Sequence, residues 1–199
     1  MPRIFTGLEI PAAVAEALAM LRGGLPGARW IDPEHYHLTL RFIGDVDDST
    51  AHEVASLLGR IRRPALELRF DSLSSFGGRR PRAVVAILAQ TAGLMELQAE
   101  HERLMQRVGL EPEGRKYTPH VTLARLREAS SRQVAEYLST RALVRPLPFS
   151  LPTRRPHPTP PAPPQPAPGQ SSASQRRLTG RTVLPRANGK VPKPPPGCR

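Results

Sequence analysis

Hydrophobic and polar positions follow two different periods along the first 150 residues. Short apolar, β-branched or aromatic stretches predict strands, and apolar residues at three- and four-residue spacing predict helices between them. The expected strands are residues 3–10, 36–43, 66–76, 83–88 and 120–126, and the expected helices are residues 12–22, 49–61, 91–108 and 131–139, before a last apolar segment at 142–149. Strands and helices alternate throughout, which predicts an α+β fold built from two similar lobes.

A short motif occurs once in each half of this pattern. It reads His37-Leu38-Thr39-Leu40 in the first half and His120-Val121-Thr122-Leu123 in the second, each time inside an expected strand. Side chains alternate across a strand, so each histidine shares one face with its threonine while the apolar residues point to the other face. If both apolar faces lie on a core, both His and Thr pairs are presented together.

Such a set of side chains fits phosphoryl transfer by acid and base catalysis. Imidazole has a pKa of about 6.5, so one ring can be neutral and accept a proton while the other is protonated and donates one. Two hydroxyls beside them can donate hydrogen bonds to phosphate oxygens. A metal site is the less favoured interpretation, because no carboxylate or third histidine stands at ligand spacing nearby. The sequence therefore predicts no metal and no cofactor.

The alternative is that the two motifs are unrelated half-buried histidines. A third His-x-Thr triplet, His157-Pro158-Thr159, lies among prolines that exclude a central strand, and a single bare triplet of this kind carries little information. Two copies with matched apolar alternation are much harder to obtain by accident.

These segments resemble the 2H phosphoesterases, and among them the RNA 2',3'-cyclic phosphodiesterases once called LigT-like 2'-5' RNA ligases. The resemblance covers about residues 3–149, and it is carried by the two motifs and by three flanking segments. The flanking segments are Gly27-Ala28-Arg29-Trp30, Phe76-Gly77-Gly78-Arg79-Arg80-Pro81-Arg82 and Pro119-His120. It implies a bilobal fold with two antiparallel sheets, flanking helices and an active-site cleft between the lobes.

The resemblance also implies a reaction and roles. The expected reaction opens a terminal 2',3'-cyclic phosphate of RNA to a 2'-phosphate, with His37 as proton donor and His120 as proton acceptor. Thr39 and Thr122 are expected to bind the phosphate. Substrates such as tRNA fragments, and action as a monomer, belong to the same expectation.

Two arginines are candidate phosphate ligands. Arg41 has the sequence parity of His37 and Thr39, whereas Arg125 has the opposite parity to His120 and needs a bend in the strand to reach the phosphate. Arg41 therefore ranks above Arg125. The arginines of residues 79–82 are candidates for RNA backbone contacts, although a solvated basic turn is the more frequent outcome for such a loop. Tyr117 and Phe42 are candidates for base stacking, although core packing is the simpler expectation for Phe42. The remaining histidines, among them His101, are expected to have no role.

Composition changes abruptly near Ser150. Residues 151–199 hold 9 Lys and Arg, 14 of the 24 prolines, and no Asp, Glu, Phe, Tyr or Trp, so little apolar surface offsets chain entropy there. We expect one bilobal domain at 1–150 and a disordered tail at 151–199. Members of the family continue past Phe149 with two further strands, and the tail is interpreted as a changed reading frame or as a basic nucleic-acid-binding segment.

Alternatives to hydrolysis of RNA ends therefore remain. They are an RNA-binding or catalytically dead protein that lacks its last strands, 2'-5' RNA ligation, and cyclic nucleotide hydrolysis. A single cysteine, Cys198, allows no intrachain disulfide, and no apolar run approaches the roughly 20 residues of a membrane span. We expect a cytoplasmic location, because Glu9 and Pro11 interrupt any apolar N-terminal segment.

Overall fold

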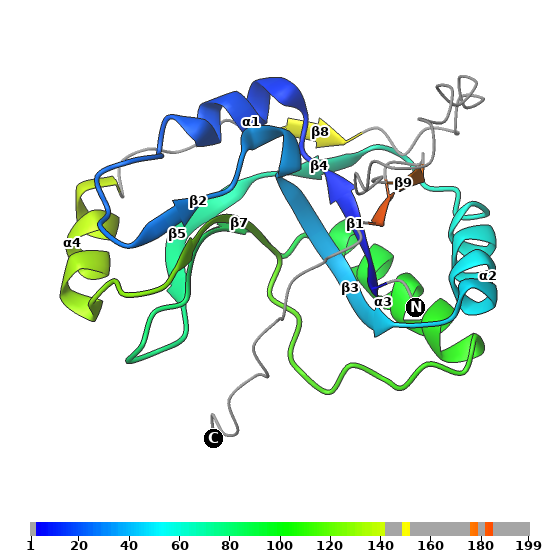
Figure 1. Cartoon of the computed structure of the whole chain (residues 1–199). Helices are drawn as coiled ribbons and strands as arrows, with labels where there is room; N and C mark the ends of the chain where they lie inside the picture. Colours follow the sequence, from blue (N-terminus) through cyan, green and yellow to red (C-terminus); the bar gives the residue numbers. More distant parts are fainter. Residues whose placement is uncertain (1–2, 142–148, 152–175, 179–181, 185–199) are drawn as a thin grey trace, which may run out of the picture.

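The computed structural model describes residues 3–141, 149–151, 176–178 and 182–184. A large sheet, whose strands do not follow one another in chain order, runs through the molecule. Helices α2 and α3 lie at one end of it and α4 at the other (Figure 1). The helices are α1 (Ala12–Ala19), α2 (Asp48–Leu58), α3 (Ala92–Arg107) and α4 (Ser131–Arg141), with a short 3-10 turn η1 at Pro33–His35. The strands are β1 (Arg3–Glu9), β2 (Ala28–Trp30), β3 (His37–Asp45), β4 (Leu66–Leu68), β5 (Phe70–Phe76), β6 (Ala83–Leu88), β7 (His120–Leu126), β8 (Phe149–Leu151), β9 (Arg176–Leu178) and β10 (Thr182–Leu184).

The strand order explains how the two halves are joined. The main sheet runs β5-β6-β7-β3-β1-β10-β9, with β2 paired to β7, and all the pairings are antiparallel. Strands β3 and β7 meet through one register pair, Leu38 with Val121. The α+β fold with two antiparallel halves is confirmed, and the halves form one continuous sheet at this pair.

The core lies on one face of this sheet. Leu38 and Val121 are fully buried there, together with apolar side chains from three helices. These helix residues are Leu18 of α1, Leu94 and Leu97 of α3, and Val134 and Tyr137 of α4. Burying one such leucine stabilises the fold by about 2 kcal/mol relative to its exposure, so the apolar half of each His-x-Thr strand is firmly fixed to the core.

Several element boundaries differ from the expected ones. Residues 66–76 form two strands, because β4 pairs with β8 while β5 pairs with β6. Strand β2 was not expected, since its three residues are too few for a periodic signal. Helix α3 ends where Gly109 was expected to end it, and Gly109 takes a φ of 82°, which glycine adopts without strain.

The predicted disorder of residues 151–199 concerns mostly residues outside the described part. The described pieces are Leu151 at the end of β8, which pairs with Leu66 of β4, and the strands β9 and β10, which pair with each other. Strand β10 also pairs with β1 at Leu8 and Thr182. Within the described residues, the edge of β1 opposite β3 is thus paired with another strand. The apolar segment at 142–149 likewise lies outside the described residues except for Phe149.

Candidate active site

The two His-x-Thr motifs lie side by side at the join between the halves. Because Leu38 pairs with Val121 and both are fully buried, the residues on either side of them point to the opposite face. His37, Thr39, His120 and Thr122 therefore share this face, and each is partly exposed. The structure brings together the four residues that the motifs singled out.

The register also sets their relative positions. Continuing the antiparallel pairing by one residue on each side of Leu38 and Val121 puts His37 opposite Thr122 and Thr39 opposite His120. The two histidines are then diagonal neighbours, whose separation in an antiparallel pair is about 7–8 Å. A phosphate group held between two such imidazoles would have one threonine hydroxyl beside each ring.

Backbone carbonyls hold both rings in the same way. Nδ1 of His37 lies 2.7 Å from the carbonyl oxygen of His35, and Nδ1 of His120 lies 2.8 Å from that of Thr118. A carbonyl oxygen only accepts hydrogen bonds, so each Nδ1 carries a proton and donates it. The Nε2 atom of each ring is left to accept or donate a proton.

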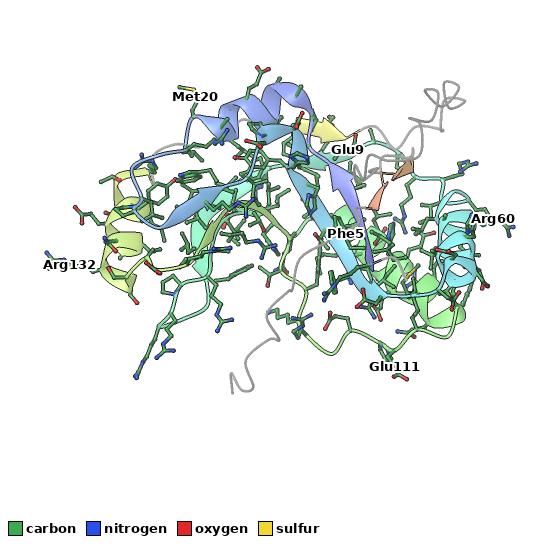
Figure 2. The ribbon with its side chains drawn as sticks, in the orientation of Figure 1. Phe5, Glu9, Met20, Arg60, Glu111 and Arg132 are labelled. Atoms are coloured by element: carbon green, nitrogen blue, oxygen red, sulfur yellow. The ribbon has the colours of Figure 1, made fainter. Side chains whose placement is uncertain are left out.

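Aromatic side chains fix the two rings from the sides. Phe5 of β1, labelled near the centre of Figure 2, stacks on His37 with ring centroids 4.7 Å apart and an angle of 24° between the planes. Phe76 of β5 meets His120 edge to face at 4.8 Å and 78°. The sequence alone does not indicate these partners, because the contacts come from neighbouring strands and depend on the strand order.

Burial and charge lower the pKa of both histidines. Loss of hydration is the largest cause for His37 and for His120, and it is partly opposed by the carbonyl hydrogen bonds. The positive charge of Arg125 lowers the pKa of both rings further, and His120 has the same effect on His37. Arg125 is therefore electrostatically coupled to both histidines.

A β-bulge brings Arg125 to the histidine face. In the pairing of β6 with β7, Thr122 is opposite Val85 and Ala124 is opposite Val84, so Leu123 is an extra residue. Leu123 and Ala124 are both fully buried, and Arg125 is exposed. The extra residue reverses the alternation, which gives Arg125 the orientation of His120 and Thr122.

The equivalent bulge in β3 takes Arg41 away from that face. Thr39 pairs with Gly7 and Arg41 with Thr6, so Leu40 is the extra residue and both Leu40 and Arg41 are buried. This corrects the expectation from sequence parity, which put Arg41 beside His37 and above Arg125. Phe42, expected in the core, is 39% exposed instead, and the guanidinium of Arg3 lies 5.3 Å from its ring centroid.

Arg41 is held by acidic and carbonyl groups on the core side. Its Nε lies 2.6 Å from a carboxylate oxygen of Glu102 in α3, as a close ionic contact rather than an aligned hydrogen bond, and Nη1 lies 3.8 Å from Glu113. Its guanidinium also donates to the backbone carbonyls of Phe42 and Glu111. The contacts with Glu102, Glu111 and Glu113 tie β3 to α3 and to the segment after it.

Tyr117 links the two motifs directly. Its hydroxyl donates a 3.1 Å hydrogen bond to the backbone carbonyl of Thr39, and burial raises the pKa of the phenol, which stays protonated as a donor. Tyr117 stands three residues before His120 in the chain. The side chain thus joins the second motif to the backbone of the first, and it packs against the core instead of standing free for stacking.

A buried histidine lies behind the sheet. His101 of α3 is 3% exposed, and its Nδ1 lies 2.9 Å from the hydroxyl of Thr6, the residue paired with Arg41. Burial lowers the pKa of His101 to about 4, so its ring is neutral near pH 7. The helix-face position was foreseen, but the contact with β1 was not.

The described residues contain no group of three or more His, Cys, Asp or Glu placed to hold a metal ion, and metal independence stays a prediction. In that same part of the chain, no helix has the length and hydropathy to cross a bilayer.

Comparison with known families agrees with the fold and with the paired motifs. The model described as LigT like phosphoesterase matches residues 8–86 and again residues 87–158, and each matched segment contains one His-x-Thr motif. The chain belongs to this family of phosphoesterases.

Curated relatives have one name in common. An RNA 2',3'-cyclic phosphodiesterase of Aeropyrum pernix is 36% identical over 108 residues, which cover 53% of this chain and 61% of the relative. The chain thus matches less than two thirds of that relative's length. An RNA 2',3'-cyclic phosphodiesterase of Escherichia coli is 31% identical over 132 residues, 64% of this chain and 73% of the relative.

Solved structures show the same architecture. Escherichia coli LigT in complex with 3'-AMP has a TM-score of 0.54 and 28% identity, and the match covers 65% of this chain and 75% of LigT. LigT in its apo form has a TM-score of 0.58 at 24% identity and covers 75% of this chain and 83% of LigT, a likeness of fold.

Proposed function

We propose that this protein hydrolyses 2',3'-cyclic phosphate at the 3' end of RNA to a 2'-phosphomonoester, by acid and base catalysis from two histidines and without a metal ion. The observation that carries the proposal is the register pair Leu38 and Val121, which sets two His and Thr pairs around one position. The relatives named RNA 2',3'-cyclic phosphodiesterase support the choice of substrate.

The proposed reaction is one in-line displacement. Nε2 of His120 accepts a proton from water as the water oxygen bonds to phosphorus. The bond between phosphorus and the 3' oxygen breaks, and Nε2 of His37 gives its proton to that oxygen. The hydroxyls of Thr39 and Thr122 donate hydrogen bonds to the non-bridging oxygens, where negative charge increases.

Arg125 completes the phosphate site in this proposal. Its bulged position on β7 puts a permanent positive charge on the histidine face, and its effect on both histidine pKa values supports closeness to the reacting group. A guanidinium donates two parallel hydrogen bonds to phosphate oxygens, which suits an anion that gains charge in the transition state.

The decisive test is turnover of a short RNA that ends in 2',3'-cyclic phosphate, with EDTA present. We expect a 2'-phosphate product from the wild type and losses of at least about 100-fold in kcat/KM for His37→Ala and for His120→Ala. A folded wild-type protein that binds this RNA without turnover would favour the RNA-binding alternative. Joining of the RNA to a second strand with a free 5'-hydroxyl would favour ligation.

A second substrate separates the roles of the two histidines. In a 3'-deoxynucleoside 2'-(4-nitrophenyl phosphate), the leaving nitrophenolate needs no proton. His37→Ala is therefore expected to keep far more of the wild-type rate on this ester than on the cyclic phosphate, whereas His120→Ala loses both rates. The opposite pattern would exchange the acid and the base.

The proposal also covers the RNA ends that serve as substrates, the oligomeric state of the protein and its location in the cell. Terminal cyclic phosphates, those of tRNA fragments included, are the RNA ends this site would take, and a monomer contains both histidines in one chain. Gel filtration combined with light scattering tests the monomer, and fractionation of cells that carry the gene tests the proposed cytoplasmic location.

A further inference from the structure

A row of side chains crosses four strands next to the histidines. Arg29 of β2 pairs with Arg125 of β7, and Arg125 also pairs with Ala83 of β6. Ala83 pairs in turn with Phe76 of β5, whose ring contacts His120. Residues that pair directly in antiparallel strands point to one face, so Arg29 lies on the face of Arg125 and His120.

Both arginines of the row are exposed, while the neighbours of Arg29 face inward. Ala28 and Trp30 pack against the core, which fixes the orientation of Arg29 between them. Like charges directly opposite each other across two strands are destabilising. The Arg29 and Arg125 pair therefore lowers the stability of the protein without ligand, and phosphates bound at the two guanidinium groups would offset that cost.

The β5–β6 hairpin adds further positive charge beside Phe76. It carries three exposed arginines, Arg79, Arg80 and Arg82, and it projects from the end of the sheet in Figure 1. Its first glycine, Gly77, has a φ of 113°, and a Cβ there would lie 2.3 Å from the carbonyl oxygen of Arg80. The hydroxyl of Ser131 in α4 donates to the carbonyl of Arg79 at 2.8 Å and holds the hairpin in place.

None of these five arginines forms an ion pair within the described residues. Other arginines do so, as with Arg22 and Asp32, Arg63 and Glu100, and Arg115 and Glu113. An uncompensated cationic group beside a phosphate site is the arrangement that binds a nucleic acid backbone. We call this set, Arg29, Arg79, Arg80, Arg82 and Arg125, the arginine track.

We propose that Arg29 and the three hairpin arginines of the arginine track bind phosphodiesters of the RNA chain that precede the cyclic end, beside Arg125 at the reacting phosphate, so that the protein prefers oligonucleotides to mononucleotides. The inference rests on the proposed function and specifies its substrate. A cyclic phosphate closes the 3' end, so the rest of the RNA leaves the histidines in the 5' direction. Arg125 holds the reacting phosphate, and Arg29, one strand further along the sheet, receives the next phosphate.

The experiment compares two substrates with the same reacting group. These are cytidine 2',3'-cyclic phosphate and a five-nucleotide RNA that ends in the same cyclic phosphate. We expect a wild-type kcat/KM at least about tenfold higher for the RNA at low salt, since one charged contact contributes about that factor. Arg29→Gln should lower the ratio of the two kcat/KM values about tenfold, and Arg29→Lys should lower it less.

Arg60→Gln is the matched control. Arg60 is also exposed, but it lies beyond α2 at the other end of the molecule (Figure 2), and its substitution should leave the ratio as in the wild type. The ratio is insensitive to partial unfolding, because both substrates report on the same folded fraction. Arg29→Gln should also make the plot of log(kcat/KM) against log salt for the RNA shallower by about 0.7, the value for one single-strand phosphate contact.

Two results would overturn the inference. One is equal wild-type kcat/KM for both substrates, and the other is an equal ratio in Arg29→Gln and Arg60→Gln. Failure of the proposed function is distinguishable, because neither substrate would then be hydrolysed. In that case the fluorescence anisotropy of the labelled RNA still decides: weaker binding by Arg29→Gln than by Arg60→Gln supports the arginine track, and equal binding refutes it.

Discussion

The arginines that follow the two His-x-Thr motifs in the chain, Arg41 and Arg125, are expected to respond in opposite ways to the same substitution. Arg41→Met leaves the carboxylate of Glu102 without its partner in a site where the Arg41 side chain is 9% exposed and that of Glu102 is 18% exposed. Removing one partner of a buried pair costs about 3–5 kcal/mol of unfolding free energy. For a chain of this size, Tm falls by about 2–4 °C per kcal/mol, so a decrease of roughly 6–20 °C is expected.

Arg125→Met removes an exposed charge that makes no ion pair within the described residues. Its effect on the free energy of unfolding should stay within about 0.5 kcal/mol. The loss of kcat/KM should be about 100-fold or more, as for other groups that stabilise transition-state charge. Thermal unfolding and hydrolysis of the cyclic RNA end, each measured on both variants, give the comparison.

A double variant controls for the ion pair. Arg41→Met combined with Glu102→Gln removes both charges, so it should recover part of the Tm that Arg41→Met loses. An Arg41→Met variant that keeps the wild-type Tm and loses turnover would contradict the orientations that the two bulges give to Arg41 and Arg125. An Arg125→Met variant that unfolds at a much lower temperature and, while folded, turns over the substrate normally would contradict them equally.

Three further predictions concern titration and positioning. Since burial and Arg125 lower the pKa of both His37 and His120, the kcat/KM profile should peak below pH 6.5, and Arg125→Gln should move the peak upward; a peak above pH 7 in the wild type would contradict this. Tyr117→Phe removes the hydrogen bond to the Thr39 carbonyl, so kcat should fall about tenfold with little change in KM, and an unchanged kcat would exclude a positioning role. The neutral ring of His101 stabilises the folded state fully above pH 6.5, and about 3 kcal/mol is lost as the pH falls toward 4; urea unfolding should show this loss in the wild type and a smaller one in His101→Gln.

The sequence predicted which side chains share the face of the candidate site wherever the alternation along a strand is regular. Within His37-Leu38-Thr39 and His120-Val121-Thr122, period-two alternation predicted the shared face that the structure has. It did not extend to Arg41 and Arg125, because one extra residue in each strand reverses the alternation. In β7 a signal was present, since Leu123 and Ala124 are consecutive apolar residues, but in β3 the charge of Arg41 concealed the same break.

Contacts between strands were the other limit of the prediction. The strand order decides that Phe5 stacks on His37 and that Arg29 pairs with Arg125, and no local pattern in the chain carries that order. Strand β2 is three residues long and follows a glycine-rich turn, so it resembled a loop. The sequence indicated Tyr117 as an aromatic residue near His120, but its hydrogen bond to the Thr39 carbonyl depends on the pairing of β3 with β7, which the sequence does not reveal.

That join has a consequence for how the protein responds to its substrate. Among the described residues, strands β3 and β7 meet through the single register pair Leu38 and Val121, and continuing that register puts His37 opposite Thr122 and Thr39 opposite His120. On the proposed function, one bound phosphate therefore contacts residues of both β3 and β7 and links the two halves of the sheet reversibly. Amide hydrogen exchange at Leu38 and Val121 should then slow when phosphate binds, because the bound anion stabilises the junction of β3 and β7 against local opening. In the proposed reaction the substrate would thus stabilise the site at which it reacts.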